Sequence, residues 1–413
     1  LEDFKRQGFD EVFLEVIPYN FNVHPILDSV SLLYVHPLNS HKGYMLSISH
    51  SETLPLDIDA ITQALGEIKK IYVRDKKSTL QYITLKSLLD SQPTHNTYIP
   101  DYTHTHKWFY QQHKDKLDVN RIIPVVKHYE YCESIFTNMD VFNTKCEDDY
   151  CQWFNQKTSI VFSAIEANGL RVNKELFEEY FHPIEDDYVY TQYNLKTLTT
   201  RPSNTFNGVN YAALNKENGS RQCFIPRNDI LLELDISAYH PTLLANLVDY
   251  DFGDKDIHAA FAEMYGVDYK KAKELTFKQL YGGVFDQYKN LEFFKKVQAY
   301  TDELWDTFQY GGFVKMPNSG YILRREDTQD MKPQKLLNYV IQNLETSTNV
   351  RILWEILKLL RGKKTKLVLY TYDAFLFDLS SDEKEVINEI NQIIKGYKLA
   401  TKISYGSTYD FTE

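Results

Sequence analysis

Residues 367–379 read LVLYTYDAFLFDL. Two apolar runs flank the segment 372–374 (YDA), and this pattern predicts a strand, a tight turn and a second strand. Residues 229–235 read DILLELD, and their alternation predicts a further strand that ends at Asp235. The sequence therefore predicts two apolar strands that each carry an aspartate at one end, Asp235 and Asp373.

A carboxylate at the end of a buried strand loses hydration, and this cost is tolerable when the group is paired, hydrogen-bonded or metal-bound. Two such carboxylates brought together repel each other unless cations lie between them. Two hard cations held in this way are the machinery of in-line phosphoryl transfer. Taken singly, Asp235 and Asp373 are each more often ordinary turn residues.

Composition indicates a soluble globular protein. The 413 residues suffice for two or three domains, and 43% are hydrophobic and 25% charged. No apolar window approaches the roughly 18 residues of a membrane span, and there is no signal peptide. The four cysteines lack the paired spacing of a zinc site, so we expect reduced thiols and a cytoplasmic location. The net charge of −11 argues against indiscriminate nucleic-acid binding, but it is compatible with a localised basic groove.

Between the two aspartates, residues 269–281 are predicted to form a helix. Lys273, Phe277 and Tyr281 recur every four residues and therefore share one face. Such a face offers a cation for phosphates, a flat apolar surface for a sugar and base, and a phenol to stack on a template base. An amphipathic surface helix with its lysines in water is the alternative interpretation. A longer helix is predicted at 333–361, ending at Gly362.

The order of these motifs resembles DNA polymerase family A, which includes bacterial repair polymerase I and many phage replicative polymerases. The resemblance covers about residues 150–413. Residues 200–204 (TRPSN) are similar to the family's Thr-Gly-Arg-x-Ser-Ser motif, with Thr200 in place of glycine. This implies that Arg201 contacts the primer–template minor groove. Residues 234–237 (LDIS) resemble the first catalytic motif.

The resemblance also implies roles for further residues. His258, in the segment DIH, would touch the nucleotide triphosphate together with Lys273. Phe277 and Tyr281 would form the sugar–base pocket. Two Mg²⁺ ions would be held by the catalytic aspartates. Asn338 and Gln342 lie one turn apart and match the pair that reads the minor groove at the primer end.

Four further positions depart from the family pattern. The arginine expected four residues before Lys273 is Tyr269, so Lys270 or Lys271 would have to supply that charge. At the position of the glutamate that acts as the family's ribose gate, this chain has His240. Alanine stands at position 374, where the family has a third carboxylate, and tyrosine stands at position 372, where it has histidine.

The first 145 residues stand where the family carries a proofreading 3′–5′ exonuclease with an RNase H-like fold. Strands are predicted at 12–17, 30–35 and 43–48 and a helix at 58–68. The exonuclease needs Asp-x-Glu on its first strand, but residues 13–17 read FLEVI. We therefore expect a relic without metal ligands. Histidines at 24, 36, 41, 104 and 106 are interpreted as scattered turn residues rather than a zinc site.

Only 32 residues separate Gly169 from Arg201 (201 − 169 = 32). The family carries there a helical thumb of the order of a hundred residues, so a reduced thumb is expected, with one short helix and a strand. The predicted fold class is α+β: a right-hand polymerase domain at 146–413, preceded by the RNase H-like α/β domain at 1–145.

The resemblance implies a DNA-directed DNA polymerase of a phage, at work in the cytoplasm of a bacterial host, without proofreading. Its partners would be primer–template DNA, dNTPs and a processivity or replisome protein. Two alternatives stay open. A single-subunit RNA polymerase or primase-like enzyme is one, because a small residue and Phe375 follow Asp373 and the ribose gate is altered. A non-catalytic nucleic-acid-binding accessory protein is the other.

Overall fold

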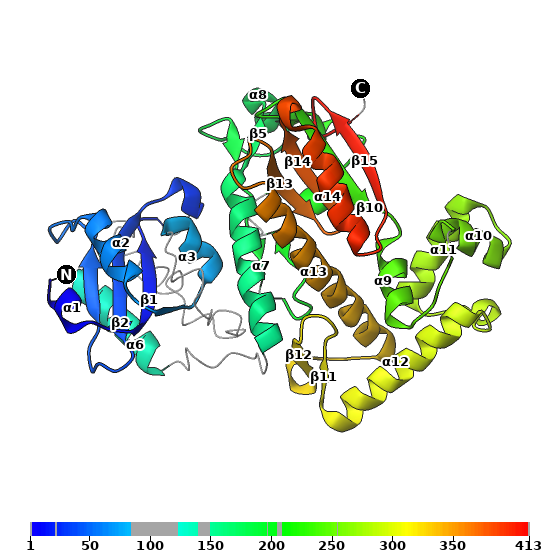
Figure 1. Ribbon diagram of the computed structural model, residues 1–413, viewed down its shortest axis with the longest axis horizontal. Coiled ribbons are helices and arrows are strands. Elements are labelled where there is room, and N and C mark those ends of the chain that lie inside the picture. Colours follow the sequence, from blue (N-terminus) through cyan, green and yellow to red (C-terminus); the bar gives the residue numbers. More distant parts are fainter. Residues whose placement is uncertain are drawn as a thin grey trace. The chain divides into compact units, whose positions relative to one another are not determined.

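The computed structural model describes residues 2–20, 23–83, 123–138, 149–195, 197–204, 209–253 and 255–411. The chain divides into two compact units, Leu1–Ala167 and Asn168–Glu413 (Figure 1). The predicted limit between residues 145 and 146 lies outside the described residues and stays a prediction. Among the described residues, no helix combines the length and the apolar character needed to cross a membrane.

The first unit is built on a mixed four-stranded sheet with helices on both faces. The strand order is β3-β2-β1-β4, in which β1 pairs antiparallel with β2 and parallel with β4. Alternate residues of β1 enter two different cores, Val12 and Leu14 on one face and Phe13 and Ile17 on the other. The bounds are α1 Glu2–Gln7, β1 Glu11–Pro18, β2 Val30–Pro37, β3 Tyr44–Ser47, α2 Ile58–Gly66, β4 Lys70–Val73, α3 Lys76–Tyr82, α6 Val125–Asn138 and α7 Asp149–Asn168.

These elements confirm the predicted α/β organisation. The three predicted strands correspond to β1, β2 and β3, and the predicted helix to α2. Ile61 and Leu65 of α2 pack on the face of β1 that carries Leu14, whereas Ile135 of α6 packs on the opposite face. Because both faces are covered, β1 and β2 are almost continuously apolar.

The second unit contains an antiparallel sheet with the order β13-β14-β10-β15. Helices α13 and α14 lie over one face of this sheet (Figure 1). The predicted strand–turn–strand is confirmed, because β13 and β14 are joined by a two-residue turn, Tyr372-Asp373. The bounds are β10 Ile230–Ile236, α13 Pro333–Leu359, β13 Lys366–Thr371, β14 Ala374–Leu379, α14 Glu385–Gly396 and β15 Thr401–Gly406.

A helical part lies between β10 and α13 in the sequence. Its core contains Phe261, Leu280 and Phe293, and it continues onto Leu337 and Ile341 of α13. The predicted helix at 269–281 is confirmed as α11, whereas a twenty-residue helix, α12, has no counterpart among the predictions. The bounds are α9 Tyr239–Leu247, α10 Ile257–Tyr265, α11 Tyr269–Gly282, α12 Glu292–Gly311, β11 Phe313–Lys315 and β12 Ile322–Arg324.

The segment between α7 and Arg201 contains one short helix and short strands, as predicted. Its residues pack against the sheet of the second unit, where Phe177 of α8 and Leu170 of β5 share a core with Leu231 and Leu376. Among the described residues of this segment no long helix occurs. The bounds here and just beyond are β5 Leu170–Val172, α8 Lys174–Tyr180, β6 Tyr188–Val189, β7 Tyr193–Asn194, β8 Ser203–Asn204 and β9 Phe224–Ile225.

Candidate active site

The two aspartates predicted from the strand ends lie on neighbouring strands. Asp235 is the last residue but one of β10 and stands opposite Ala374 of β14. The amide of Ile236 donates a hydrogen bond of 2.8 Å to the carbonyl oxygen of Asp373. This bond holds the end of β10 against the β13–β14 turn, so both carboxylates occupy one end of the sheet.

The pKa of each of the two aspartates is raised above its ordinary value. The pKa of Asp373 is raised to about 6, first by loss of hydration and then by the negative charge of Asp235. The residue as a whole is nevertheless exposed. Loss of hydration also raises the pKa of Asp235, against the opposing charges of Lys216, Lys273 and Lys402. Uncompensated repulsion between two carboxylates is the electrostatic condition that a bound cation relieves.

Neither carboxylate is held by another side chain. Among the described residues, none forms a hydrogen bond or an ion pair with the side chain of Asp235 or Asp373, apart from the backbone of Asp373 itself. The described part of the chain contains no group of three or more His, Cys, Asp or Glu arranged to hold a metal ion. Two free carboxylates with hard oxygen donors nevertheless fit Mg²⁺, which binds through one or two carboxylates and completes its shell with water and phosphate oxygens.

Helix α11 presents its predicted face beside α10. The rings of Phe277 and Tyr281 are parallel, with centroids 6.2 Å apart, and both side chains are exposed. His258 of α10 is buried beside them, with its ring 6.4 Å from that of Phe277. Burial lowers the pKa of His258, and the charge of Lys273 lowers it further. Since Lys273 also acts on Asp235, the predicted nucleotide-binding residues and the aspartate form one electrostatic cluster.

The imidazole of His258 has an unused polar atom. Its Nδ1 is buried, and no hydrogen-bond partner for it occurs among the described residues. The lysines that could replace the family's arginine differ in position: Lys271 pairs with Glu274 at 3.2 Å, whereas no interaction of the described residues joins the exposed Lys270 to the site. The charge expected from that arginine therefore has no evident substitute on the described face of α11.

A buried glutamate that sequence reasoning missed connects the remaining predicted residues. Glu345 of α13 is 1% exposed and accepts hydrogen bonds from Arg201, at 3.1 Å from Nε and 3.4 Å from the terminal nitrogen. It also contacts Nε2 of His240, whose Nδ1 contacts the hydroxyl of Tyr281. The guanidinium of Arg201 lies 3.6 Å from the ring centroid of Tyr372. Four residues from four segments are thus linked, directly or through one another, to the carboxylate of Glu345.

Helix α13 carries these contacts on a polar stripe. Residues 338, 342, 345 and 349 recur at spacings of four, three and four, which places them on one face of the helix. Asn349 donates hydrogen bonds to the hydroxyl of Tyr370 at 3.0 Å and to the carbonyl of Tyr372 at 2.9 Å. The spacing that joins Asn338 and Gln342 continues to Glu345 and Asn349, and this was the signal in the sequence.

Asn338 and Gln342 occupy the beginning of the stripe. The amide nitrogen of Asn338 donates to the carbonyl of Tyr281 at 3.4 Å, and its Oδ1 is buried without a partner among the described residues. Gln342 is half-buried one turn further on. Asn338 therefore anchors the end of α11, and the side chain of α13 that binds Arg201 is that of Glu345.

The predicted relic site in the first unit contains an ion pair. Glu15, the carboxylate in the middle of β1, is buried and contacts Arg74, with 3.0 Å between Nε and Oε2 and a second contact to Oε1. Arg74 follows β4, the strand parallel to β1. The guanidinium therefore occupies the position beside this carboxylate that a cation would need.

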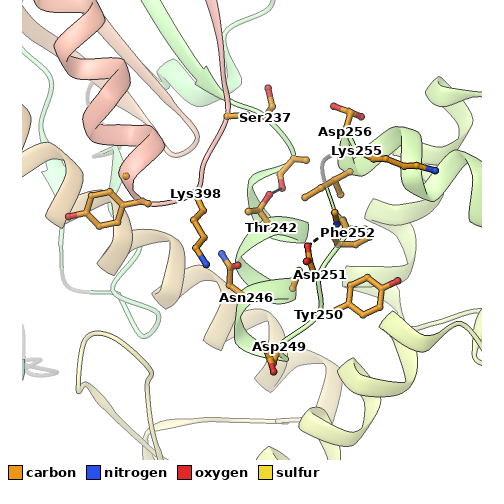
Figure 2. A pocket seen from close by; sticks show the side chains of 17 residues that line it. Ser237, Thr242, Asn246, Asp249, Tyr250, Asp251, Phe252, Lys255, Asp256 and Lys398 are labelled. Carbon is orange, nitrogen blue, oxygen red and sulfur yellow. Dashed lines mark hydrogen bonds between the residues drawn. The ribbon is translucent and has the colours of Figure 1, made fainter.

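A pocket of 820 Å³ lies elsewhere in the second unit. Figure 2 shows it between α9, which contributes Thr242 and Asn246, the segment with Asp251, and the segment after α14 with Lys398. None of the predicted nucleotide-binding side chains lines it. The pocket is thus separate from the face formed by α10 and α11.

The fold can be compared with those of solved structures. The chain is similar to a structure described as the POL domain of Pol1 from M. smegmatis in complex with DNA primer-template and dNTP. The TM-score is 0.71 and the identity 12%, and the match covers 100% of this chain and 97% of that chain. No family model matches the sequence. A search of curated proteins finds no match either.

The similarity establishes the fold class. The chain has an α+β polymerase fold, and the predicted fold class is confirmed. An identity of 12% carries the fold and nothing finer, so the chemistry must be argued from the residues of this chain.

Proposed function

We propose that this chain is a DNA-directed DNA polymerase that transfers a nucleotide from a dNTP to a primer 3′-hydroxyl. The observation that carries the proposal is the juxtaposition of Asp235 and Asp373, two carboxylates that have no side-chain partner among the described residues, at one end of the sheet β13-β14-β10-β15. The neighbour of the same fold was solved with a DNA primer-template and a dNTP, which supports the same class of substrate here.

Asp235 and Asp373 would hold two Mg²⁺ ions. When bound, these ions supply activation of the primer hydroxyl and stabilisation of the leaving pyrophosphate. The chain itself contributes two ionised carboxylates at a fixed separation, because β10 and the β13–β14 turn are joined by a backbone hydrogen bond. Lys402, opposite Asp235 on β15, keeps the net charge at this end of the sheet from becoming strongly negative.

The exposed face of α11 would bind the nucleotide. Lys273 is close enough to influence both Asp235 and His258, and an ammonium group there would attract the triphosphate toward the carboxylates. Burial keeps His258 neutral, so its free Nδ1 can form a hydrogen bond with a phosphate oxygen only as a donor tautomer. The parallel rings of Phe277 and Tyr281 offer a surface for the sugar and base.

The primer end would meet Arg201, with Asn338 and Gln342 beside it. Arg201 is partly exposed although it pairs with Glu345, so part of its guanidinium can still donate to acceptors in the minor groove. His240 would act as the ribose gate in place of the family's glutamate. Lys270 would interact with the triphosphate only after movement of α11.

Extension of a labelled primer on a DNA template, with Mg²⁺ and either dNTPs or NTPs, tests the proposal. We expect extension with dNTPs by the wild-type chain and none by Asp235→Asn. Extension with NTPs instead would favour the RNA polymerase alternative, for which the specific observation is that His240 replaces the gate glutamate. Absence of extension with both nucleotide sets, together with retained DNA binding, would favour the accessory protein.

The biological setting forms part of the same proposal. A phage replication enzyme in the cytoplasm of a bacterial host agrees with a polymerase whose strand β1 carries no Asp-x-Glu and whose thumb segment is short. Such an enzyme would need a processivity or replisome partner to copy long templates. Its first unit would serve as a structural or DNA-holding domain.

A further inference from the structure

Glu345 is the one residue of the described site that joins the primer-end arginine to the ribose-gate histidine. Its Oε1 accepts from Nε of Arg201 at 3.1 Å, and its Oε2 contacts both the terminal nitrogen of Arg201 and Nε2 of His240. At 1% exposure this carboxylate has almost no access to water. Its charge is therefore compensated by these two side chains.

The electrostatics of Arg201 agree with this arrangement. Burial alone would lower the pKa of the guanidinium, but the negative charge of Glu345 and the hydrogen bonds to it raise the pKa instead. The stacking of Arg201 on Tyr372 at 3.6 Å fixes the plane of the guanidinium. Arg201 and Glu345 thus form a rigid pair next to the turn that carries Asp373.

Glu345 also determines which nitrogen of His240 carries a proton. Because Nε2 faces a carboxylate, it must be the donor, and in the tautomer with its proton on Nε2 the Nδ1 atom is an acceptor. Loss of hydration, together with the negative charge of Glu345, raises the pKa of Tyr281 to about 12, so its hydroxyl stays protonated and can donate to Nδ1. The order of donation is Tyr281 to His240 to Glu345.

We propose that Glu345 is a positioning residue for sugar selection. It fixes the orientation and tautomer in which His240 and Tyr281 face the sugar of the incoming nucleotide, so the barrier against a 2′-hydroxyl depends on α13 as well as on the strand β10 and helix α9. The substrate class it discriminates is ribonucleoside against deoxyribonucleoside triphosphates. This inference rests on the proposed function, because it requires nucleotide insertion at this site.

The variant Glu345→Gln tests the proposal. Glutamine keeps the volume and can still accept from Arg201, but it then presents its amide nitrogen to Nε2 of His240, and the histidine must change tautomer or rotate. We expect the ratio of kcat/KM for dATP to that for ATP to fall about tenfold, the factor that corresponds to one hydrogen bond to a charged group. Thr346→Val is the matched control, because Thr346 is the adjacent buried residue of α13 and bonds only within its helix.

A double-variant comparison separates positioning from a structural effect. If Glu345 acts through His240, Glu345→Gln should change the selectivity little in a His240→Ala background, in which the ratio is already lowered. Tyr281→Phe, which removes only the hydroxyl, should lower the ratio in the same direction as Glu345→Gln. This variant keeps the proposal testable if a change at the buried position impairs folding.

The outcomes distinguish the inference from the function on which it rests. A wild-type chain that inserts neither dATP nor ATP opposite template thymine would overturn the proposed function. A wild-type chain that inserts dATP, with an unchanged ratio in Glu345→Gln and Tyr281→Phe, would overturn the role of Glu345 alone. Additive effects of Glu345→Gln and His240→Ala would likewise overturn positioning through the histidine.

Discussion

Three residues other than glycine adopt left-handed backbone conformations beside predicted site residues. Thr200, with φ of 61°, precedes Arg201; Tyr372, with φ of 66°, precedes Asp373; and Ala238, with φ of 46°, lies between the strand with Asp235 and the helix with the gate histidine. Each such conformation costs roughly 1 kcal/mol or more for a residue with a side chain. At position 200 the resemblance leads one to expect glycine, and the positive φ of Thr200 explains why glycine suits this position.

The carboxylates of Asp235 and Asp373 carry the first prediction. Asp235→Asn or Asp373→Asn should lower the rate of primer extension by about a thousandfold or more, because each removes a metal ligand charge worth several kcal/mol in the transition state. Binding of primer–template DNA should persist, since a neutral amide repels phosphates less than a carboxylate does. Single-turnover extension and a DNA-binding titration measure the two effects. A variant that extends primers at nearly the wild-type rate would refute the site assignment.

Protonation of Asp373 predicts a pH dependence. Its pKa is raised from 3.8 to about 6, so the carboxylate needed for catalysis is lost as the pH falls through 6. We expect kcat to decrease by up to tenfold per pH unit below about 6, as one required group titrates. A rate–pH profile between pH 5 and 8 checks this, and a rate independent of pH in that range would contradict it.

The raised pKa of Asp373 also affects the stability of the fold: the ionised carboxylate that catalysis requires makes the folded state less stable. Because the folded-state pKa exceeds the unfolded value, ionisation disfavours the folded state, and the contribution of this group to stability decreases as the pH rises from about 4 to 6. Asp373→Asn should therefore be at least as stable as the wild-type chain at pH 7. The gain should be about 1 kcal/mol or less, since the residue is exposed and solvent screens the repulsion. Equal or higher stability together with lost activity would distinguish a functional residue from a structural one.

At the scale of the element, α13 shows what periodicity can predict and what it cannot. The sequence predicts its beginning at Pro333 and its end close to Gly362, because both are local properties. The role of Glu345 depends on Arg201 and His240, which are 144 and 105 residues away in the sequence, and no local pattern records such a contact. For the same reason β15 was not predicted: it is a half-exposed edge strand whose existence depends on pairing with β10.

Asn349 of α13 provides a prediction about the turn that carries Asp373. Asn349→Ala would remove hydrogen bonds to the carbonyl of Tyr372 and to the hydroxyls of Tyr370 and Tyr239, at 2.9, 3.0 and 2.7 Å. We expect a loss of roughly 2–4 kcal/mol in the free energy of unfolding, because buried polar groups are left without partners. Urea denaturation followed by circular dichroism measures it.

Ser347→Ala is the control for Asn349→Ala. Ser347 is equally buried on the same helix, and its hydroxyl bonds only to the carbonyl of Leu344 within α13. Its replacement should cost about 1 kcal/mol or less. Equal losses in the two variants would mean that Asn349 contributes only to packing and that the turn is held by other contacts.

At the scale of the whole molecule, the first unit has the α/β sheet of the predicted exonuclease-like domain, but its strand β1 carries a neutralised carboxylate. We predict that the chain cannot proofread, since Glu15 is paired with Arg74 and no second carboxylate of an Asp-x-Glu motif accompanies it. A mismatched primer incubated with Mg²⁺ and Asp235→Asn should release no mononucleotides. Their metal-dependent release would contradict the prediction.

Arg74 supplies the control for that experiment. If the pair of Arg74 and Glu15 is structural, Arg74→Met should lower stability by roughly 3–5 kcal/mol, because it removes the guanidinium from a buried carboxylate, and it should not create nuclease activity. The double variant Arg74→Met, Glu15→Met should recover most of that stability, since apolar residues of similar volume can replace a buried ion pair. Thermal unfolding of both variants measures the difference.

In the proposed polymerase, the segment between α7 and Arg201 would limit how long the chain stays on DNA. Its helix α8 has seven residues, about 10 Å in length, and among the described residues of 169–201 no second helix accompanies it. Across this segment acidic residues outnumber basic ones: the acids are Glu175, Glu178, Glu179, Glu185, Asp186 and Asp187, and the bases are Arg171, Lys174, Lys196 and Arg201. Arg171 pairs with Asp187, and Arg201 with Glu345, which leaves few cations for phosphates.

We therefore predict distributive synthesis by the purified chain. Each missing contact of a lysine or arginine with a phosphate removes the free energy of counterion release, so affinity for duplex DNA should be weak. Because few phosphates are neutralised, the affinity should also change little with salt concentration. Extension in a single binding event, with heparin as a trap for released enzyme, should add only a few nucleotides. Products hundreds of nucleotides long would contradict the prediction and would mean that other surfaces of the chain hold the duplex. If a processivity partner holds the duplex instead, long products should occur only when that partner is added.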